Sequence, residues 1–179
     1  MRARPGPIAA LAAALAGCAA SPGSAPEAPL PTLPSAPPAA PGCELAAGGA
    51  LDRPGLVVAE ASFSGGSGWP GLPRAGGGPP VCVGPTLFVL DADAVENAQP
   101  YPDPATGRPL LGLGLSPEAA AAFARITAER VGQPIAILDD GQLLTAPVVR
   151  AAITGGSVEL TGFDTLERAR ELARRLTAR

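Results

Sequence analysis

Apolar and polar positions are patterned most clearly within residues 133–163, and this stretch predicts the centre of a small sheet. Residues 135–138 form a short apolar run that is typical of a buried strand. Asp139-Asp140-Gly141 then favours a turn, because aspartate bonds its own backbone and glycine accepts positive φ. An extended apolar pattern resumes over residues 143–149, with Pro147 expected at a strand end or edge. The pattern therefore predicts a hairpin.

A further strand is expected after this hairpin. The pair Gly155-Gly156 favours a second turn, because glycine is the residue that most readily changes the direction of a chain. Val158, Leu160 and the β-prone Thr161 follow it at strand spacing. We therefore expect this strand to lie in the same small sheet as the hairpin.

The chain upstream of residue 116 predicts other elements. Residues 56–61 are a candidate strand, and residues 86–90 read as another. Residues 91–98 predict a short helix with Asp91 as its N-cap. Leucine and glycine alternate over residues 110–115, which predicts a strand whose glycines would let a helix approach closely.

Two helices are predicted from caps and from apolar spacing. The first begins at Ser116-Pro117, a good N-cap followed by proline at the first helical position, and ends at Gly132. One face of it carries Ala119, Ala122, Phe123, Ile126 and Arg130. The second begins at Asp164 or Thr165, and its apolar stripe comprises Leu166, Ala169, Leu172, Ala173 and Leu176. Together these elements predict an α+β fold: a small antiparallel or mixed sheet with two main helices packed on one face.

Residues of this half of the chain also resemble a known family. An apolar strand ends in Leu138-Asp139 and Gly141, Ala146-Pro147 follows, and Leu160-Thr161-Gly162-Phe163 precedes the last helix. Other matching positions are Phe123, Thr127, Gly132, Ile135, Ala136, Ile153, Gly156, Glu167 and Ala169. Over residues 86–176 this pattern resembles the head subdomain of the first periplasmic domain of SecD and SecDF protein-export subunits, here as a stand-alone lipoprotein.

The resemblance carries expectations about function. In that family the head contacts the emerging polypeptide and moves relative to a base domain, while proton coupling resides in transmembrane helices. This sequence contains neither such helices nor base-domain motifs, so energy-coupled pulling is not expected. The resemblance implies contact between a sheet edge or groove and an extended polypeptide, and we place that contact at Leu144, Ala146 and Pro147.

The start of the chain is typical of a targeting segment. Arg2 and Arg4 precede a short apolar run over residues 8–15, and Leu15-Ala16-Gly17-Cys18 then resembles the bacterial lipobox. We expect a lipoprotein signal peptide over residues 1–17 and a lipid anchor, including palmitate, on Cys18. A non-lipidated signal or a buried apolar helix are the alternatives.

The residues that follow Cys18 predict a tether and the membrane that holds it. Residues 18–42 are rich in proline and alanine and cannot bury enough apolar surface to fold, so we expect a disordered tether. Ala19 rather than aspartate stands directly after Cys18. In this the sequence resembles Gram-negative lipoproteins that are sorted to the outer membrane, since aspartate there favours retention at the inner one. We therefore expect a cell-envelope protein that faces the periplasm, at the outer membrane rather than the inner one.

Two cysteines remain, Cys43 and Cys82. In an exported protein two such cysteines favour a disulfide, with two free thiols as the alternative. Residues 43–84 predict an irregular lead-in with one candidate strand and a Gly/Pro loop, and residues 85–179 the head-like domain. Trp69 lies within that loop and is expected to tuck onto the core, with an exposed contact as the other reading.

Composition removes much of the usual chemistry. The sequence has no histidine, and all 13 basic residues are arginine, against 16 acidic residues and a formal net charge of −3. Without histidine or lysine the commonest bases and metal ligands are missing, so we expect no enzyme activity, no metal and no cofactor. A mildly acidic chain is also not attracted to nucleic acid.

Two acidic groups and one basic group leave alternatives open. Asp91, Asp93 and Glu96 are expected to cap a helix, and Asp139 and Asp140 to form a turn. Their convergence in one cleft would instead favour a carboxylate-dependent hydrolase or a metal binder. Five arginines close the chain, namely Arg168, Arg170, Arg174, Arg175 and Arg179. We expect a solvated helix face there, with a partner-docking patch as the alternative.

The leading hypothesis is a lipid-anchored, non-enzymatic envelope protein. It would bind polypeptides or assist protein export, with a polypeptide substrate or a Sec translocon component as partner and the membrane contacted through the lipid. The alternative from a different class is a structural lipoprotein that docks within an envelope complex.

Overall fold

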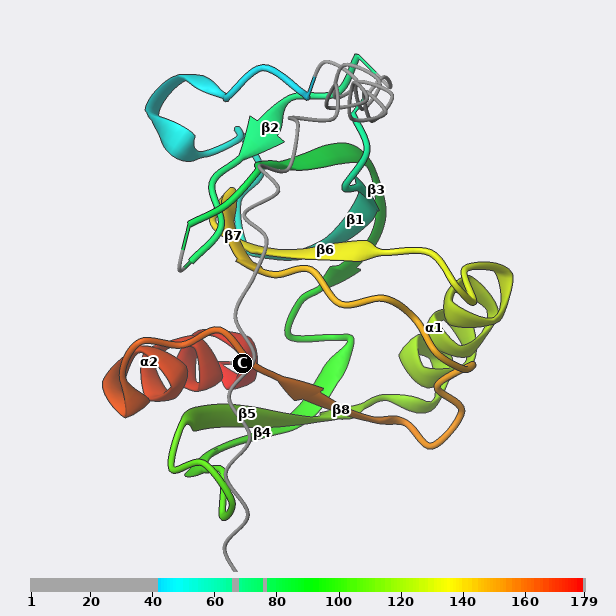
Figure 1. The fold of residues 1–179 in the computed structure, drawn as a ribbon. Helices are drawn as coiled ribbons and strands as arrows, with labels where there is room; N and C mark the ends of the chain where they lie inside the picture. The colour runs from blue at the N-terminus through cyan, green and yellow to red at the C-terminus, as the bar shows by residue number, and fades with distance from the viewer. Residues whose placement is uncertain (1–41, 66–67, 76, 179) are drawn as a thin grey trace, which may run out of the picture. The chain divides into compact units, whose positions relative to one another are not determined.

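The computed structural model describes residues 42–65, 68–75 and 77–178, which form two antiparallel sheets and two long helices (Figure 1). The signal peptide, Cys18 and all but the last residue of the expected tether lie outside the described residues. A short 3-10 helix, Ala47–Gly49, precedes the first strand. The α+β class predicted from the sequence is confirmed.

The larger sheet has five strands in the order β2-β3-β1-β6-β7. Their bounds are Leu56–Ser62 for β1, Gly71–Leu72 for β2, Val81–Leu90 for β3, Ile135–Asp139 for β6 and Gln142–Thr145 for β7. The candidate strand of residues 56–61 is therefore confirmed as β1, and it lies in the middle of the sheet. The segment that we expected to be an irregular lead-in supplies this central strand, all of β2 and the start of β3.

The smaller sheet has three strands in the order β4-β5-β8. Their bounds are Val95–Pro102, Pro109–Leu115 and Ser157–Leu160. We expected β8 to join the hairpin in one sheet, but it pairs with β5 in the second sheet. Apolar spacing shows which face of a strand is buried and does not name its partner, so this assignment depends on the tertiary fold.

The short helix predicted over residues 91–98 is wrong. Asp91 Oδ1 accepts hydrogen bonds from the backbone N–H groups of Asp93 and Ala94, at 3.1 and 2.9 Å, and so closes a turn. The chain then enters β4 at Val95 and pairs with β5. Asp91 does cap a turn, but strand pairing overrides the helical propensity of the residues that follow.

The two predicted helices are present, as α1 Pro117–Glu129 and α2 Leu166–Thr177. Ser116 Oγ accepts from the Ala119 N–H at 3.4 Å, and Thr165 Oγ1 accepts from the Arg168 N–H at 3.2 Å. The stripe predicted for α2 is buried at Ala169, Leu172, Ala173 and Leu176, and Leu166 at its start is half-buried. On α1 the buried residues are Ala119, Phe123 and Thr127, because Thr127 donates its hydroxyl to the Phe123 carbonyl and so satisfies its polar group inside the core.

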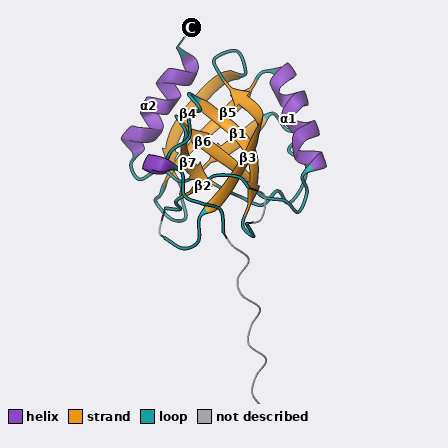
Figure 2. Ribbon diagram, turned by 90° about the horizontal axis from the view of Figure 1, so that it is seen from above, coloured by secondary structure: helices purple, strands orange, loops and turns teal. Residues whose placement is uncertain are grey.

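Both helices pack against the core between the sheets, and Figure 2 shows them on opposite sides of the strands. The larger sheet is buried on both faces. Leu56 and Val58 of β1 belong to the core between the sheets, whereas Val57 and Ala59 belong to a second apolar cluster on the other face. A continuous apolar run is what a strand buried on both faces requires.

The glycines of β5 do not receive a helix. A Cβ atom on Gly112 would lie 3.2 Å from Tyr101 Cε1, and one on Gly114 would lie 2.3 Å from Asn97 Nδ2. The space above both glycines is thus occupied by side chains of the neighbouring strand β4. The alternate leucines of β5 are buried and face the core.

The disulfide predicted between Cys43 and Cys82 is present, with 5.5 Å between the two Cα atoms. It fastens the segment before β1 to β3. The Trp69 ring lies against Gly84 of β3, where an added Cβ would be 2.6 Å from Trp69 Cζ2. Trp69 is half-buried, in agreement with the expectation that it packs onto the folded domain.

Candidate functional site

A groove of about 1090 Å³ lies between the two sheets. One side is formed by β7 with the following Ala146, together with residues 161–164 after β8, which contact β7. The turn between β4 and β5 and Arg74 complete the lining. The surface is mixed, because leucine and phenylalanine side chains lie beside threonine hydroxyls and single acidic and basic groups.

The three residues predicted to contact polypeptide lie at or beside this groove but differ in accessibility. Leu144 is only 7% exposed and belongs to the core. Ala146 is half-buried and lines the groove, and Pro147, the next residue, is exposed. Only Ala146 and Pro147 can therefore present their side chains to a ligand.

The glycine of the Thr161-Gly162-Phe163 sequence covers part of β7. Gly162 has a φ of +99°, and a Cβ atom there would lie 2.0 Å from the Leu144 carbonyl oxygen. Thr161 Oγ1 and Thr145 Oγ1 are 3.4 Å apart on the same side. Residues 161 and 162 thus cover β7 at Leu144 and Thr145. A ligand can therefore reach the groove, whereas it cannot pair along the edge of β7.

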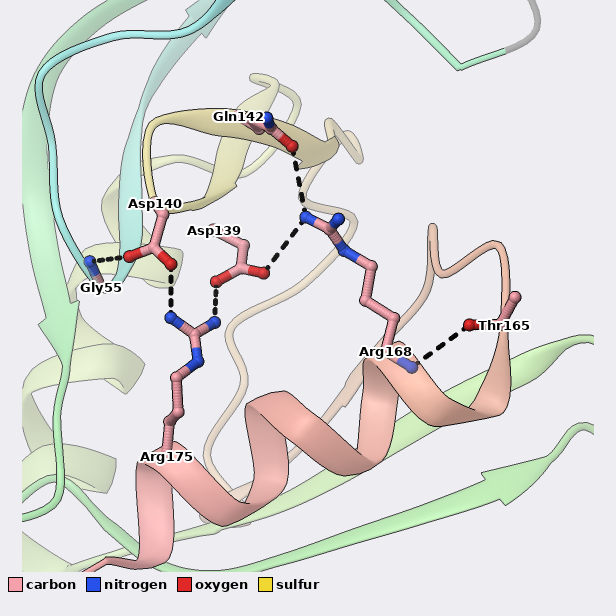
Figure 3. Close-up of polar contacts among 7 residues, drawn as sticks. All are labelled: Gly55, Asp139, Asp140, Gln142, Thr165, Arg168 and Arg175. Atoms are coloured by element: carbon pink, nitrogen blue, oxygen red, sulfur yellow. Dashed lines mark hydrogen bonds and ion pairs between the residues drawn. The ribbon is translucent and has the colours of Figure 1, made fainter.

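A cluster of ion pairs joins the β6–β7 hairpin to α2 (Figure 3). Arg175 donates to the carboxylates of both Asp139 and Asp140. Arg168 donates to Asp139 Oδ2 at 3.4 Å and to Gln142 Oε1 at 3.3 Å. The two arginines are seven residues apart, which places them on the same face of the helix two turns apart. Asp139 is only 4% exposed, so its charge requires a partner inside the protein, and both arginines bind it.

This cluster of ion pairs lies next to the groove. A smaller hollow of about 100 Å³ is lined by Asp139, Gln142 and Arg168, and it shares Leu143, Leu144 and other lining residues with the groove. The ion pairs therefore hold β7, one wall of the groove, at a set distance from α2.

The turn at Asp140 has its own support. Asp140 and Gly141 have φ values of +47° and +77°, and the flanking residues Asp139 and Gln142 pair directly, which is the geometry of a two-residue type I′ hairpin. The Gly55 N–H donates to Asp140 Oδ1 at 2.8 Å. This hydrogen bond, with the charge of Arg175, lowers the pKa of Asp140. Burial lowers the pKa of Arg175, but the hydrogen bonds and charges of Asp139 and Asp140 outweigh burial and raise this pKa above its usual value.

The lowered pKa of Asp140 has a consequence for stability at acid pH. A carboxyl group whose pKa is lower in the folded state stabilises the fold above the unfolded value of about 3.9, and this contribution is lost as the pH falls through the folded-state pKa. We expect Asp140→Asn, which keeps the acceptor for Gly55, to lower the free energy of unfolding at pH 6 by less than about 1 kcal/mol. The difference from wild type should shrink towards pH 2 in urea titrations.

The matched control for this measurement is Asp52→Asn. Asp52 is an exposed carboxylate near the same hairpin, and it makes no hydrogen bond or ion pair with the described residues. It should leave the pH dependence unchanged. Equal pH profiles for wild type and Asp140→Asn would contradict a stabilising role for the ionised Asp140.

The C-terminal arginines are thus engaged within the molecule. Arg168 and Arg175 bind the hairpin, and the other two described arginines pair with glutamates three residues earlier in α2, Arg170 with Glu167 at 2.6 Å and Arg174 with Glu171. Arg179 lies outside the described residues. Sequence reasoning missed this cluster, although an Asp-Asp turn and two arginines on one helix face were its signal.

The two acidic groups considered for catalysis or metal binding are not brought together. Asp91 closes a turn, Asp139 and Asp140 bind arginines, and no three His, Cys, Asp or Glu side chains are grouped in the part of the chain that the structure describes. The convergence that a hydrolase or metal binder would need is therefore not observed among these residues.

The fold and the groove define a class of small, disulfide-linked α+β domain with a concave surface between two sheets. The family model "SecDF, P1 head subdomain" matches residues 72–178, more than half of the chain, and the chain belongs to this family. The match runs from β2 through α2, whereas the central strand β1 lies before it.

Individual relatives agree with this assignment. The chain is 40% identical over 96 residues to the protein translocase subunit SecDF of Thermus thermophilus, covering 54% of this chain and 12% of that protein. It is 41% identical over 95 residues to SecD of Sebaldella termitidis, covering 53% of this chain and 23% of that protein. A solved structure titled as a membrane component SecDF that enhances protein export matches with 36% identity and a TM-score of 0.49, over 54% of this chain and 42% of that one.

The chain thus spans less than a quarter of the full length of these two relatives. Within residues 42–65, 68–75 and 77–178, no helix has the length and apolar character needed to cross a membrane.

Proposed function

We propose that this chain is a lipid-anchored, non-enzymatic envelope protein that binds extended polypeptide segments in support of protein export. Its folded domain faces the periplasm, carried on the tether of residues 18–42 and held by lipid on Cys18, at the outer membrane rather than the inner one. The partners are unfolded secretory chains and a component of the Sec translocon. Membership of the SecDF head family supports the link to export.

The groove between the sheets is the observation that carries the proposal. It is about 1090 Å³, above the usual range of small-molecule pockets, and both apolar residues and threonines line it. Such a surface accommodates varied side chains, as binding without strict sequence preference requires. Ala146 lines the groove beside β7, and the exposed Pro147 follows it in the chain.

A structural lipoprotein that docks through its C-terminal arginines has less support. The four described arginines of α2 are each bound to carboxylates of the same chain. An acidic partner would therefore have to compete with carboxylates that already bind these arginines.

The proposal is tested by site-specific photocrosslinking of the full chain in intact cells. A photoreactive residue replaces Pro147, which is exposed beside the groove, and the control replaces Ala128, which is exposed on α1. We expect position 147 to capture many different secreted chains, identified by mass spectrometry, in at least several-fold excess over position 128. Capture of one stoichiometric envelope protein would favour the structural alternative, and equal capture at both positions would exclude the groove as the binding surface.

A further inference from the structure

The two sheets have four edge strands, and three of them are protected against pairing with another chain. The strand β2 has two residues, and its Gly71 already exchanges backbone hydrogen bonds with residues 44–46. The strand β4 contains Pro100 and Pro102 and packs against α2. The strand β7 has an irregular register with β6 and is covered at Leu144 by Gly162. Short length, proline, irregularity and cover are the usual means of protecting an edge.

The fourth edge strand, β8, is also short, but it has no proline, no irregular register and no covering segment of the kind found at β7. Its four residues pair with β5 in a regular register, from Leu111 with Leu160 to Gly114 with Ser157. It contains no proline and no basic residue. Apart from β5, no helix or strand in the described part of the chain packs closely along it, and its backbone makes no hydrogen bond to other described segments.

An edge strand directs alternate N–H and C=O groups away from its partner, so β8 offers a row of unpaired donors and acceptors. Its side chains alternate cleanly: Val158 and Leu160 are buried, and Ser157 and Glu159 are exposed. The strand also leads directly into residues 161–164, which line the groove. A segment added along β8 would therefore continue into the groove.

Two kinds of strand could pair with this edge: β8 of a second copy of this chain, or a segment of a different polypeptide. The charge at Glu159 distinguishes between them. In an antiparallel pair of two copies of β8, one register places Glu159 opposite its own copy, where the two carboxylates repel. The register centred on Val158 instead brings the turn residue Gly156 into the ladder. Glu159 is exposed, and its Oε1 accepts a hydrogen bond from the Tyr101 hydroxyl of β4, across Gly112 of β5. Its Oε2 accepts no hydrogen bond from the described residues, so the carboxylate favours a different chain with a basic residue at the facing position.

We propose that β8 binds an extended polypeptide segment as an added antiparallel strand, with a basic side chain of that segment opposite Glu159. This inference rests on the proposed function and specifies its binding mode: backbone hydrogen bonds provide affinity for any extended chain, and Glu159 provides a preference for basic segments.

The test uses the purified full chain and fluorescent nine-residue peptides of alternating threonine and valine, with either arginine or glutamate at the centre. We expect the arginine peptide to bind about two- to five-fold more tightly in fluorescence anisotropy, the range of a cross-strand charge pair. Glu159→Arg should reverse the preference, whereas Glu96→Arg, at an exposed acid of β4, should not. N-methylation of the alternate amides that face β8 should abolish binding, and methylation of the other set should not.

Three outcomes would overturn the inference. Binding that survives methylation of either set of amides would show that side-chain contacts in the groove are enough to bind the peptide. That result would contradict strand pairing along β8 and leave the proposed function intact. No binding of either peptide would also contradict it. Self-association of the wild-type chain in sedimentation, changed by Glu159→Arg, would assign the edge to a second copy. Failure of the proposed function is seen separately, as equal crosslinking at positions 147 and 128.

Discussion

Replacement of both Cys43 and Cys82 by serine is expected to lower the free energy of unfolding by about 3–4 kcal/mol. The disulfide joins residues separated by 39 positions, and closing a loop of that length removes conformational entropy from the unfolded chain. The loss should appear in urea denaturation as a lower midpoint. Reduction of the wild-type protein should reproduce it.

The control is Cys18→Ser, which removes the third cysteine and leaves the disulfide intact. It should unfold at the wild-type midpoint. Equal midpoints for the oxidised wild type and the double-serine variant would show that the bond contributes nothing to stability.

The disulfide also fixes a segment that covers the larger sheet. Ala46 and Leu51 pack on the apolar cluster formed by Val57, Ala59 and other residues of that face. The Leu51 N–H donates to the Gly141 carbonyl at 2.9 Å, which joins this segment to the β6–β7 turn. We therefore expect the double-serine variant to expose residues 43–51 to protease before the rest of the domain.

Gly162→Ala is the second substitution with a large expected effect, about 3 kcal/mol of destabilisation or more. The backbone there has a φ of +99°, which disfavours any side chain, and the added Cβ would lie 2.0 Å from the Leu144 oxygen. The chain must shift to relieve this contact. Because Gly162 and Leu144 both line the groove, the shift should also reduce crosslinking from position 147.

Gly155→Ala is the matched control, at a glycine in the connection that precedes β8. A Cβ atom at Gly155 meets nothing within 4 Å, so thermal and urea unfolding should remain close to those of wild type. A Gly162→Ala variant as stable as Gly155→Ala would contradict the close approach of Gly162 to the Leu144 carbonyl.

Local elements followed well from the sequence where the signal was itself local. The Asp140-Gly141 turn, the Ser116 cap and the apolar stripe of α2 each depend on residues within a few positions of one another. Local signals misled where distant strands compete, as for residues 91–98, where pairing with β5 forms β4 in place of a helix. The family was likewise reached from dispersed residues, because its matching positions are those that cap, turn and pack.

The candidate site depended on contacts that no local pattern specifies. Asp139 was expected in a turn and Arg175 on a solvated helix face, but the fold brings the two together across 36 positions. The signal was present, since charged residues at buried positions require partners, yet burial of Asp139 was not visible from its neighbours in the sequence.

By itself the sequence determined the α+β class, both helices with their caps, the central hairpin and the disulfide partners, because turn chemistry, helical spacing and cysteine count act locally or by elimination. The tertiary structure alone decided that β8 pairs with β5, that Leu144 is buried beneath the groove, and that arginines of α2 bind the hairpin. These features arise from contacts between segments far apart in the chain, and such contacts are selected by the packing of the whole core rather than by the residues on either side.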